Sequence, residues 1–180
     1  GAACVITLDV FALAPDEVTV TTFVDSSAGP SEPASAQWQV NQQLVALDQS
    51  YTPGRVDVGE HSTLTVTLGN TLSARVAADL ALTVAFDQRS HIAALPNVET
   101  TCDGGVLTAE PGSRTLTYTG GALPGLSTCT VSVDVIAVSP GQARSTATLT
   151  YDTGASEPSN VGLAVSSNPT ISAVWSPTQG

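Results

Sequence analysis

Lysine is absent from this sequence, which contains five arginines and sixteen acidic residues. The net charge of −11 at pH 7 makes nucleic-acid phosphates and anionic membrane surfaces poor partners. Without lysine the chain cannot carry out Schiff-base chemistry, build a phosphate-binding loop of the usual kind or form a lysine–asparagine isopeptide cross-link. These absences exclude several enzyme classes and leave neutral surfaces or divalent cations as better partners.

Long hydrophobic runs are also missing. No window holds the 18 or so apolar residues that a membrane helix needs, because Asp9 interrupts the best one, so no membrane insertion is expected. The first 14 residues lack the basic region of a signal peptide. Hydrophobic residues still make up 42% of the chain, which is enough for the core of a globular protein.

The hydrophobic residues alternate with polar ones instead of recurring at helical spacing. The clearest runs are 64–68, 80–86 and 131–135, which are rich in Val, Leu and Thr. Short Gly, Pro and Asn segments such as "TPG", "EPGS" and "SPG" separate the runs and are typical of turns. The pattern predicts an all-β fold, an Ig-like antiparallel β-sandwich, because one open sheet would leave its apolar face in water.

An internal repeat divides the chain. Four matches share an offset of 125 residues: Cys4 with Cys129, Asp9 with Asp134, Pro15 with Pro140, and Glu32 with Glu157. One two-residue insertion then aligns Asp25 with Asp152. The repeat predicts that residues 1–50 are the C-terminal half of a preceding Ig-like repeat. Residues 51–174 would be a complete repeat, and residues 175–180 would begin the next repeat or form a terminal tail.

Cys4 has two interpretations. As the counterpart of Cys129 it belongs to a folded strand, since Ile6, Leu8 and Val10 alternate with polar or smaller residues. Its partner would then lie before residue 1, and residue 1 would fall in the middle of a repeat. Alternatively "AAC" is a lipoprotein cleavage box and Cys4 carries a lipid. The sequence leaves open whether Cys4 is free, lipidated or paired elsewhere.

Four segments in order resemble a known family. "YTPGRVDVGEHSTLTVTLGN", "ALTVAFDQ", "ALPNVETTCDGG" and "GGALPGLSTCTVSVDVIAVSPG" are similar to the Ig-like conserved repeats of bacterial surface proteins, the domain-of-unknown-function-eleven group and its relatives. The resemblance covers residues 51–175 fully and 1–50 as a half-copy. It implies a spacer in a long extracellular or cell-surface chain. It also implies a disulfide between Cys102 and Cys129, because the family pattern places a cysteine at each position.

Few residues suggest chemistry. Asp25 and Glu32 lie in one "SEP" loop, and Asp152 and Glu157 lie in the other, so these carboxylates are candidate calcium ligands, with solvated charge as the simpler interpretation. His61 and His91 have no second ligand at metal spacing and are interpreted as solvated loop residues. No catalytic residues and no cofactor other than a possible calcium ion are predicted.

The sequence therefore predicts a non-enzymatic extracellular repeat that forms a stalk, spacer or filament. The expected partners are neighbouring copies or adjacent repeats joined head to tail, because strands expected at 5–11 and 18–24 would otherwise leave apolar faces uncovered. An adhesin module that binds a glycan or a protein is the alternative, and exposed aromatic rings would favour it. Aromatic residues are only 4% of the chain, and Tyr51 and Trp175 occupy equivalent positions at the start of a repeat, which favours packing at the junction between repeats over sugar binding.

Overall fold

The computed structural model describes residue 7 and residues 17–39, 45–71 and 75–167, apart from the side chains of residues 17, 18, 38 and 39. The chain forms two compact units, residues 1–42 and residues 43–180. We call them the hairpin unit and the sandwich unit, and each is described by itself. The boundary expected at residue 50 falls inside a strand of the sandwich unit. Cys4, Trp175 and nearly all of the strand expected at 5–11 lie outside the described residues.

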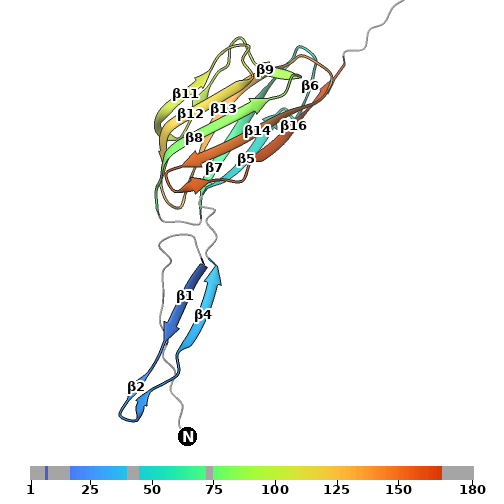
Figure 1. The fold of residues 1–180 in the computed structure, drawn as a ribbon. Coiled ribbons are helices and arrows are strands. Elements are labelled where there is room, and N and C mark those ends of the chain that lie inside the picture. Colours follow the sequence, from blue (N-terminus) through green and yellow to red (C-terminus); the bar gives the residue numbers. More distant parts are fainter. Residues whose placement is uncertain (1–6, 8–16, 40–44, 72–74, 168–180) are drawn as a thin grey trace, which may run out of the picture. The chain divides into compact units, whose positions relative to one another are not determined.

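The sandwich unit consists of two sheets that face each other (Figure 1). The first sheet contains β5 (Ala46–Thr52), β7 (His61–Asn70), β9 (Ser90–Ile92), β10 (Glu99–Thr100) and β13 (Ser127–Ala137). The second sheet contains β6 (Arg55–Asp57), β8 (Ala77–Phe86), β11 (Asp103–Ala109), β12 (Thr115–Leu123), β14 (Gly141–Tyr151), β15 (Gly154–Ala155) and β16 (Ser159–Ser166). The predicted Ig-like antiparallel β-sandwich is confirmed.

The alternation of residue types explains why these segments become strands that bury one face. In β13, Cys129, Val131, Val133, Val135 and Ala137 are buried, whereas the residues between them are only partly buried. The same period places Leu and Val residues of β7, β8 and β14 in one core between the sheets. Within the described ranges there is no helix, and hence none long and apolar enough to cross a membrane.

The first extended segment of the sandwich unit passes from one sheet to the other and is divided into two strands, β5 and β6. β5 pairs with β7 in the first sheet, and after Pro53 and Gly54 the chain continues as β6 in the second sheet. There β6 pairs with β16, and this pairing is parallel, with Val56 opposite Val165. The sequence analysis predicted only antiparallel pairing, so this parallel pair is an addition to the expected topology.

The chain enters and leaves the sandwich unit at opposite ends. At the entry end, Ala46 begins β5 opposite Gly69, near the last residue of β7. At the exit end, β16 finishes beside the start of β14, with Val165 opposite Gly141. β5 and β16 both run from the entry end to the exit end (Figure 1). Ten- and eleven-residue strands span this distance, which corresponds to about 35 Å at roughly 3.3 Å per residue.

Gln49 forms a polar bridge between the two sheets within the apolar core. It is 7% exposed and lies on β5, where its side-chain amide donates to the Ser159 carbonyl oxygen at 2.7 Å. Ser145 of β14, which is fully buried, donates its hydroxyl to Gln49 Oε1 at 3.1 Å. A buried amide with these partners fixes the position of β5 relative to β14 and β16.

The hairpin unit consists of one long β-hairpin with a short second ladder near its tip (Figure 1). Its strands are β1 (Glu17–Thr22), β2 (Asp25–Ser26), β3 (Gly29–Pro30) and β4 (Ala34–Gln39). β1 covers most of the strand that the sequence predicts at residues 18–24. Within the described part of this unit, β1 and β4 pair only with each other.

Candidate functional site

The expected disulfide is present: Cys102 and Cys129 are bonded, with their Cα atoms 4.9 Å apart. Cys102 follows β10, which pairs with β13 in the first sheet, and precedes β11, which lies in the second sheet. Cys129 lies on β13. The bond therefore fixes the point at which the chain crosses from one sheet to the other. Thr101 supports it, since its backbone N–H donates to the Thr130 carbonyl oxygen at 2.9 Å.

Glycines of the "CDGG" motif (residues 102–105) and the "TGG" motif (residues 119–121) lie against the ring of one buried tyrosine. Tyr118 of β12 is fully buried and donates its hydroxyl to the Gly104 carbonyl oxygen at 2.8 Å. Gly105 has a φ of +74°, and a Cβ added to it would come within 2.7 Å of the Tyr118 ring. Glycine is required here because the backbone is left-handed and the ring lies against it. These motifs therefore have a structural role.

Among the candidate calcium ligands, Asp152 has backbone partners and the other three carboxylates are exposed. Asp152 Oδ1 accepts the Ala78 backbone N–H at 3.1 Å, and the Asp152 N–H donates to the Ala78 carbonyl oxygen at 2.9 Å. Glu157, Asp25 and Glu32 are exposed. No group of three or more His, Cys, Asp or Glu side chains suited to a metal occurs among the described residues. Calcium takes six to eight oxygen ligands, so neither pair of carboxylates would supply more than part of a calcium site.

The histidines were placed incorrectly by the sequence analysis, which expected both in loops. His61 is the first residue of β7 and is exposed, whereas His91 is half-buried in β9, where it lies opposite Ile136. The reason is that both segments continue the strand ladder of β13, although each is flanked by turn residues. Neither histidine belongs to a metal-binding group within the described ranges.

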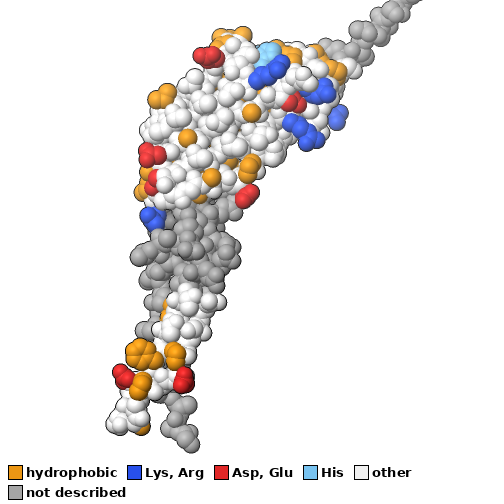
Figure 2. All heavy atoms as spheres, in the orientation of Figure 1, with side chains coloured by type: hydrophobic (Ala, Val, Ile, Leu, Met, Phe, Trp, Pro, Cys, Tyr) orange, Lys and Arg blue, Asp and Glu red, His pale blue; other side chains and the backbone are white. Residues whose placement is uncertain are grey.

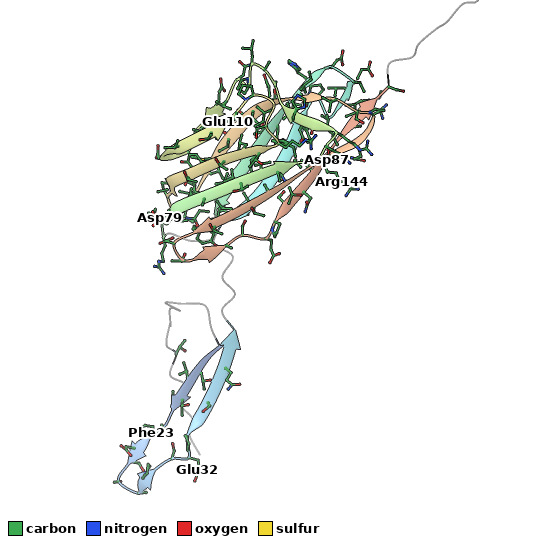
Figure 3. All side chains as sticks on the ribbon, turned by 45° about the horizontal axis from the view of Figure 1, so that its top comes forward. Phe23, Glu32, Asp79, Asp87, Glu110 and Arg144 are labelled. Atoms are coloured by element: carbon green, nitrogen blue, oxygen red, sulfur yellow. A yellow bond between two sulfur atoms is a disulfide. The ribbon has the colours of Figure 1, made fainter. Side chains whose placement is uncertain are left out.

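Two aspartates accept hydrogen bonds that stabilise the fold. Asp87 accepts two backbone N–H groups, from Arg89 at 2.8 Å and from Arg144 at 3.1 Å, so it fixes the turn after β8 (Figure 3). Asp134 accepts the Thr63 hydroxyl at 2.6 Å and the Asn97 amide at 2.7 Å. Sequence reasoning assigned no role to these contacts. The match of Asp134 with Asp9 in the repeat was the one signal that could have singled it out.

The four aromatic rings that the structure describes in the sandwich unit pack inside it. Tyr51, Phe86, Tyr118 and Tyr151 are all 7% exposed or less. Burial away from water raises the pKa of Tyr51 to about 12. Tyr51 therefore packs in the core of the sandwich unit, whereas a role at a junction between repeats was expected, and these four rings offer no stacking surface for a sugar.

Two surface depressions occur in the described part of the sandwich unit. One, of about 220 Å³, is lined by Gln142, Arg144, Asn160, Val161 and Gly162. The other, of about 420 Å³, is lined by Pro53, Val56, Gly59, Glu60 and His61. In the second, Glu60 Oε2 accepts the Asp57 backbone N–H at 3.1 Å. Neither depression brings two carboxylates together, as the glycosidase mechanism requires.

The hairpin unit reproduces the β14–β16 hairpin of the sandwich unit with the same strand register. In the hairpin unit, Glu17 lies opposite Gln39 and Thr22 lies opposite Ala34. In the sandwich unit, the residues 125 positions later in the chain lie opposite each other in the same way, Gln142 with Ala164 and Ala147 with Ser159. The sequence repeat at this offset therefore corresponds to a structural repeat of the two hairpins.

The loops of the two hairpins also agree. Asp25 pairs with Pro30, and at the same offset Thr150 pairs with Ala155. The Ser31 N–H donates to the Val24 carbonyl oxygen at 2.8 Å, as the Ser156 N–H donates to the Leu149 carbonyl oxygen at 3.0 Å. The structural counterpart of Asp25 is thus Thr150. The alignment of Asp25 with Asp152 was wrong, because it required an insertion that the register does not contain.

These observations define the sandwich unit as an Ig-like β-sandwich domain whose conspicuous residues stabilise the fold. The sequence profile of the family described as domain of unknown function (DUF7933) matches residues 46–165. The chain therefore belongs to this family. A comparison with curated proteins found no match.

Solved structures with a similar fold were also found. A cohesin module from a family 33 glycoside hydrolase of Clostridium perfringens has a TM-score of 0.51 and 11% identity, over 71% of this chain and 100% of that one. BcpA, the major pilin subunit of Bacillus cereus, has a TM-score of 0.49 and 9% identity, over 81% of this chain and 47% of that one. A collagen-binding domain from a Staphylococcus aureus adhesin has a TM-score of 0.47 and 8% identity, over 70% of this chain and 99% of that one. At this identity the similarity to the cohesin module shows the fold alone.

Proposed function

We propose that the sandwich unit is a non-enzymatic structural repeat that acts as a spacer in an extracellular or cell-surface protein. The observation that carries the proposal is the path of the chain, which enters at one end of the sandwich at Ala46 and leaves at the other at Ser166. A domain with this path adds its full length to an array of domains. We further propose that DUF7933 is related to the domain-of-unknown-function-eleven repeats that the sequence resembles.

The location outside the cytoplasm is supported by the disulfide. Bonds of this kind form and persist in oxidising compartments and are rare in the cytosol. Cys102 and Cys129 are 8% and 4% exposed, so their bond is largely shielded from solvent, as expected of a structural disulfide.

The strand pairing suits a domain under tension. A pull on the two ends of the unit acts along β5 and β16, which are paired over most of their length with β7 and β14. The hydrogen bonds of an antiparallel pair lie perpendicular to the strands, so this pull shears many bonds at once. Opening the β14–β16 hairpin from the exit end would instead break them one after another.

A glycan-binding adhesin is a weaker candidate. In the sandwich unit the four described aromatic rings are buried, and the exposed apolar side chains are Val and Leu residues such as Leu95, Val106 and Leu126. The one described ring that is exposed, Phe23, lies in the hairpin unit, outside the domain to which the proposal applies. Sugar recognition by stacking needs exposed rings. The spacer role is therefore the function that we propose.

Single-molecule pulling tests this role. One form of the full chain is attached through residues 46 and 166, and a second form through residues 141 and 166, which lie together at the exit end. A spacer predicts a clearly higher unfolding force for the first attachment than for the second, because unfolding under load is governed by the barrier that the pull must cross. Equal forces in the two geometries would contradict the proposal.

A further inference from the structure

The shared register assigns an inner and an outer face to the hairpin unit. Val24 is the counterpart of Leu149, which is 1% exposed in the core, and its neighbour Phe23 is the counterpart of Thr148, which is exposed on the outside of the sandwich. In the hairpin unit the two side chains are almost equally exposed, Phe23 (labelled in Figure 3) at 66% and Val24 at 63%. Figure 2 shows hydrophobic side chains on the surface of this unit. In the sandwich unit, the face that carries Leu149 is buried. In the hairpin unit, the equivalent face is exposed at Val24.

The sandwich unit shows what covers such a hairpin. The edge of β14 that faces away from β16 is paired with β8, with Ser145 opposite Phe86 and Thr150 opposite Ala81. The inner face of β14 and β16 is covered by the first sheet, where Gln49 of β5 bonds to both strands. The equivalent edge of the hairpin unit is formed by residues 20–25, and within the described part of that unit no third strand pairs with β1.

Elementary energetics argue that the hairpin unit is incomplete. A two-stranded hairpin alone is at best marginally stable in water, and a stable sheet needs more strands or a covered apolar face. An uncovered strand edge is also a template for pairing with another strand. A hairpin with the register of β14–β16 fits one complementary surface in particular, namely the part of the domain that precedes β14.

We propose that the β1–β4 hairpin is the last strand pair of a second Ig-like sandwich. Its partner is a segment of the same family, placed before the hairpin in the same polypeptide and equivalent to residues 45–125 and their strands β5–β12. That segment supplies a β8-like edge to β1 and a β5–β7-like sheet that covers Val24. An intact second copy of the sandwich unit does not suffice, because its β8 is already paired with β12 on one edge and β14 on the other. The inference concerns a binding surface and goes beyond the spacer role.

A chimera tests the proposal. A copy of residues 45–125 is joined directly before Gly1 of the full chain, so that Gly1 takes the place of Leu126 as the offset of 125 requires. The proposal predicts that amide hydrogen exchange at residues 20–25 becomes slower by at least about 100-fold than in the chain without the added segment. Unchanged exchange at these residues, or protection already present in the unmodified chain through dimers, would overturn it.

Two matched variants of the chimera sharpen the test. Val24→Asp places a charge on the face that becomes buried, and it should abolish the protection at residues 20–25. Phe23→Asp changes a neighbour of nearly equal present exposure on the outer face, and it should leave the protection intact. If both variants lose protection equally, or neither does, the assignment of the two faces is wrong.

A covalent readout guards against a chimera that folds poorly. Cys4 lies 125 positions before Cys129, and so it should form a disulfide with the Cys102 of the added segment. Non-reducing peptide mapping should find this bond in the oxidised chimera. A Cys4 that stays free, or that bonds to the Cys102 of the original sandwich unit, would overturn the proposal.

Discussion

Removal of the Cys102–Cys129 bond by a double substitution should strongly destabilise the sandwich unit. The bond closes a loop across a sequence separation of 27 residues. In the chain-entropy description, a loop of that length constrains the unfolded chain by about 3.6 kcal/mol at 25 °C. A typical domain is stable by only about 5–15 kcal/mol, so this is a large share. For a unit of about 125 residues the loss corresponds to a fall in Tm of about 14 °C.

The assay is urea and thermal unfolding of the full chain, followed by circular dichroism. The variant with Cys102→Ala and Cys129→Ala should unfold at lower urea concentration and lower temperature than the oxidised protein. The reduced wild-type protein should behave like the variant, since both lack the cross-link. Cys4→Ala serves as the control and should leave the transition of the sandwich unit unchanged, because Cys102 and Cys129 are bonded to each other. A loss below about 1 kcal/mol in the double variant would refute the reasoning.

Four further substitutions and one pH titration test the sandwich unit. Gly105→Ala should cost about 3 kcal/mol in the free energy of unfolding, because it adds a clash with the Tyr118 ring to the strain of a positive φ. Gly112→Ala, with a φ of +75° and open space around it, should cost only about 1 kcal/mol in the same urea melts. Gln49→Leu leaves a buried hydroxyl and a buried carbonyl without their partner and should cost about 2 kcal/mol, measured in the same way. The raised pKa of Tyr51 means that the unfolded chain loses the phenol proton first, so stability should fall as the pH rises from about 10 to about 12. Tyr51→Phe should remove that part of the pH dependence in urea melts, and an unchanged profile would contradict the assignment.

The strands were predictable from the sequence because one physical rule dominates them. Residues 131–135 alternate between apolar and polar side chains, and β13 buries the apolar ones. The disulfide was also predictable, through a family resemblance that places a cysteine at both positions. The strand pattern is local and does not depend on which strand lies next to which. The disulfide joins the end of β10 to the neighbouring β13, so it could be expected only through the resemblance.

Pairing across the sheets was not predictable in this way. The change of sheets at Pro53 and the parallel pair β6–β16 depend on packing between segments about 110 residues apart. Asp25 was misaligned with Asp152 because the alignment matched identical residues at the cost of an insertion in the loop. An alignment without the insertion keeps the two loops equal in length, and only the hydrogen-bond register shows that this second alignment is correct. Gln49 likewise looks like an ordinary polar strand residue until its partners on β14 and β16 are known.

The spacer role is tested most directly by the length of a tandem array. One, two and three copies of residues 43–167, joined at the natural spacing of 125 residues, can be compared by small-angle X-ray scattering. If each domain passes the chain from end to end, the maximum dimension should grow by an equal step of about 35 Å or more with every copy. A dimension that instead grows only as the size of a compact globule, with steps that shrink as copies are added, would contradict the account.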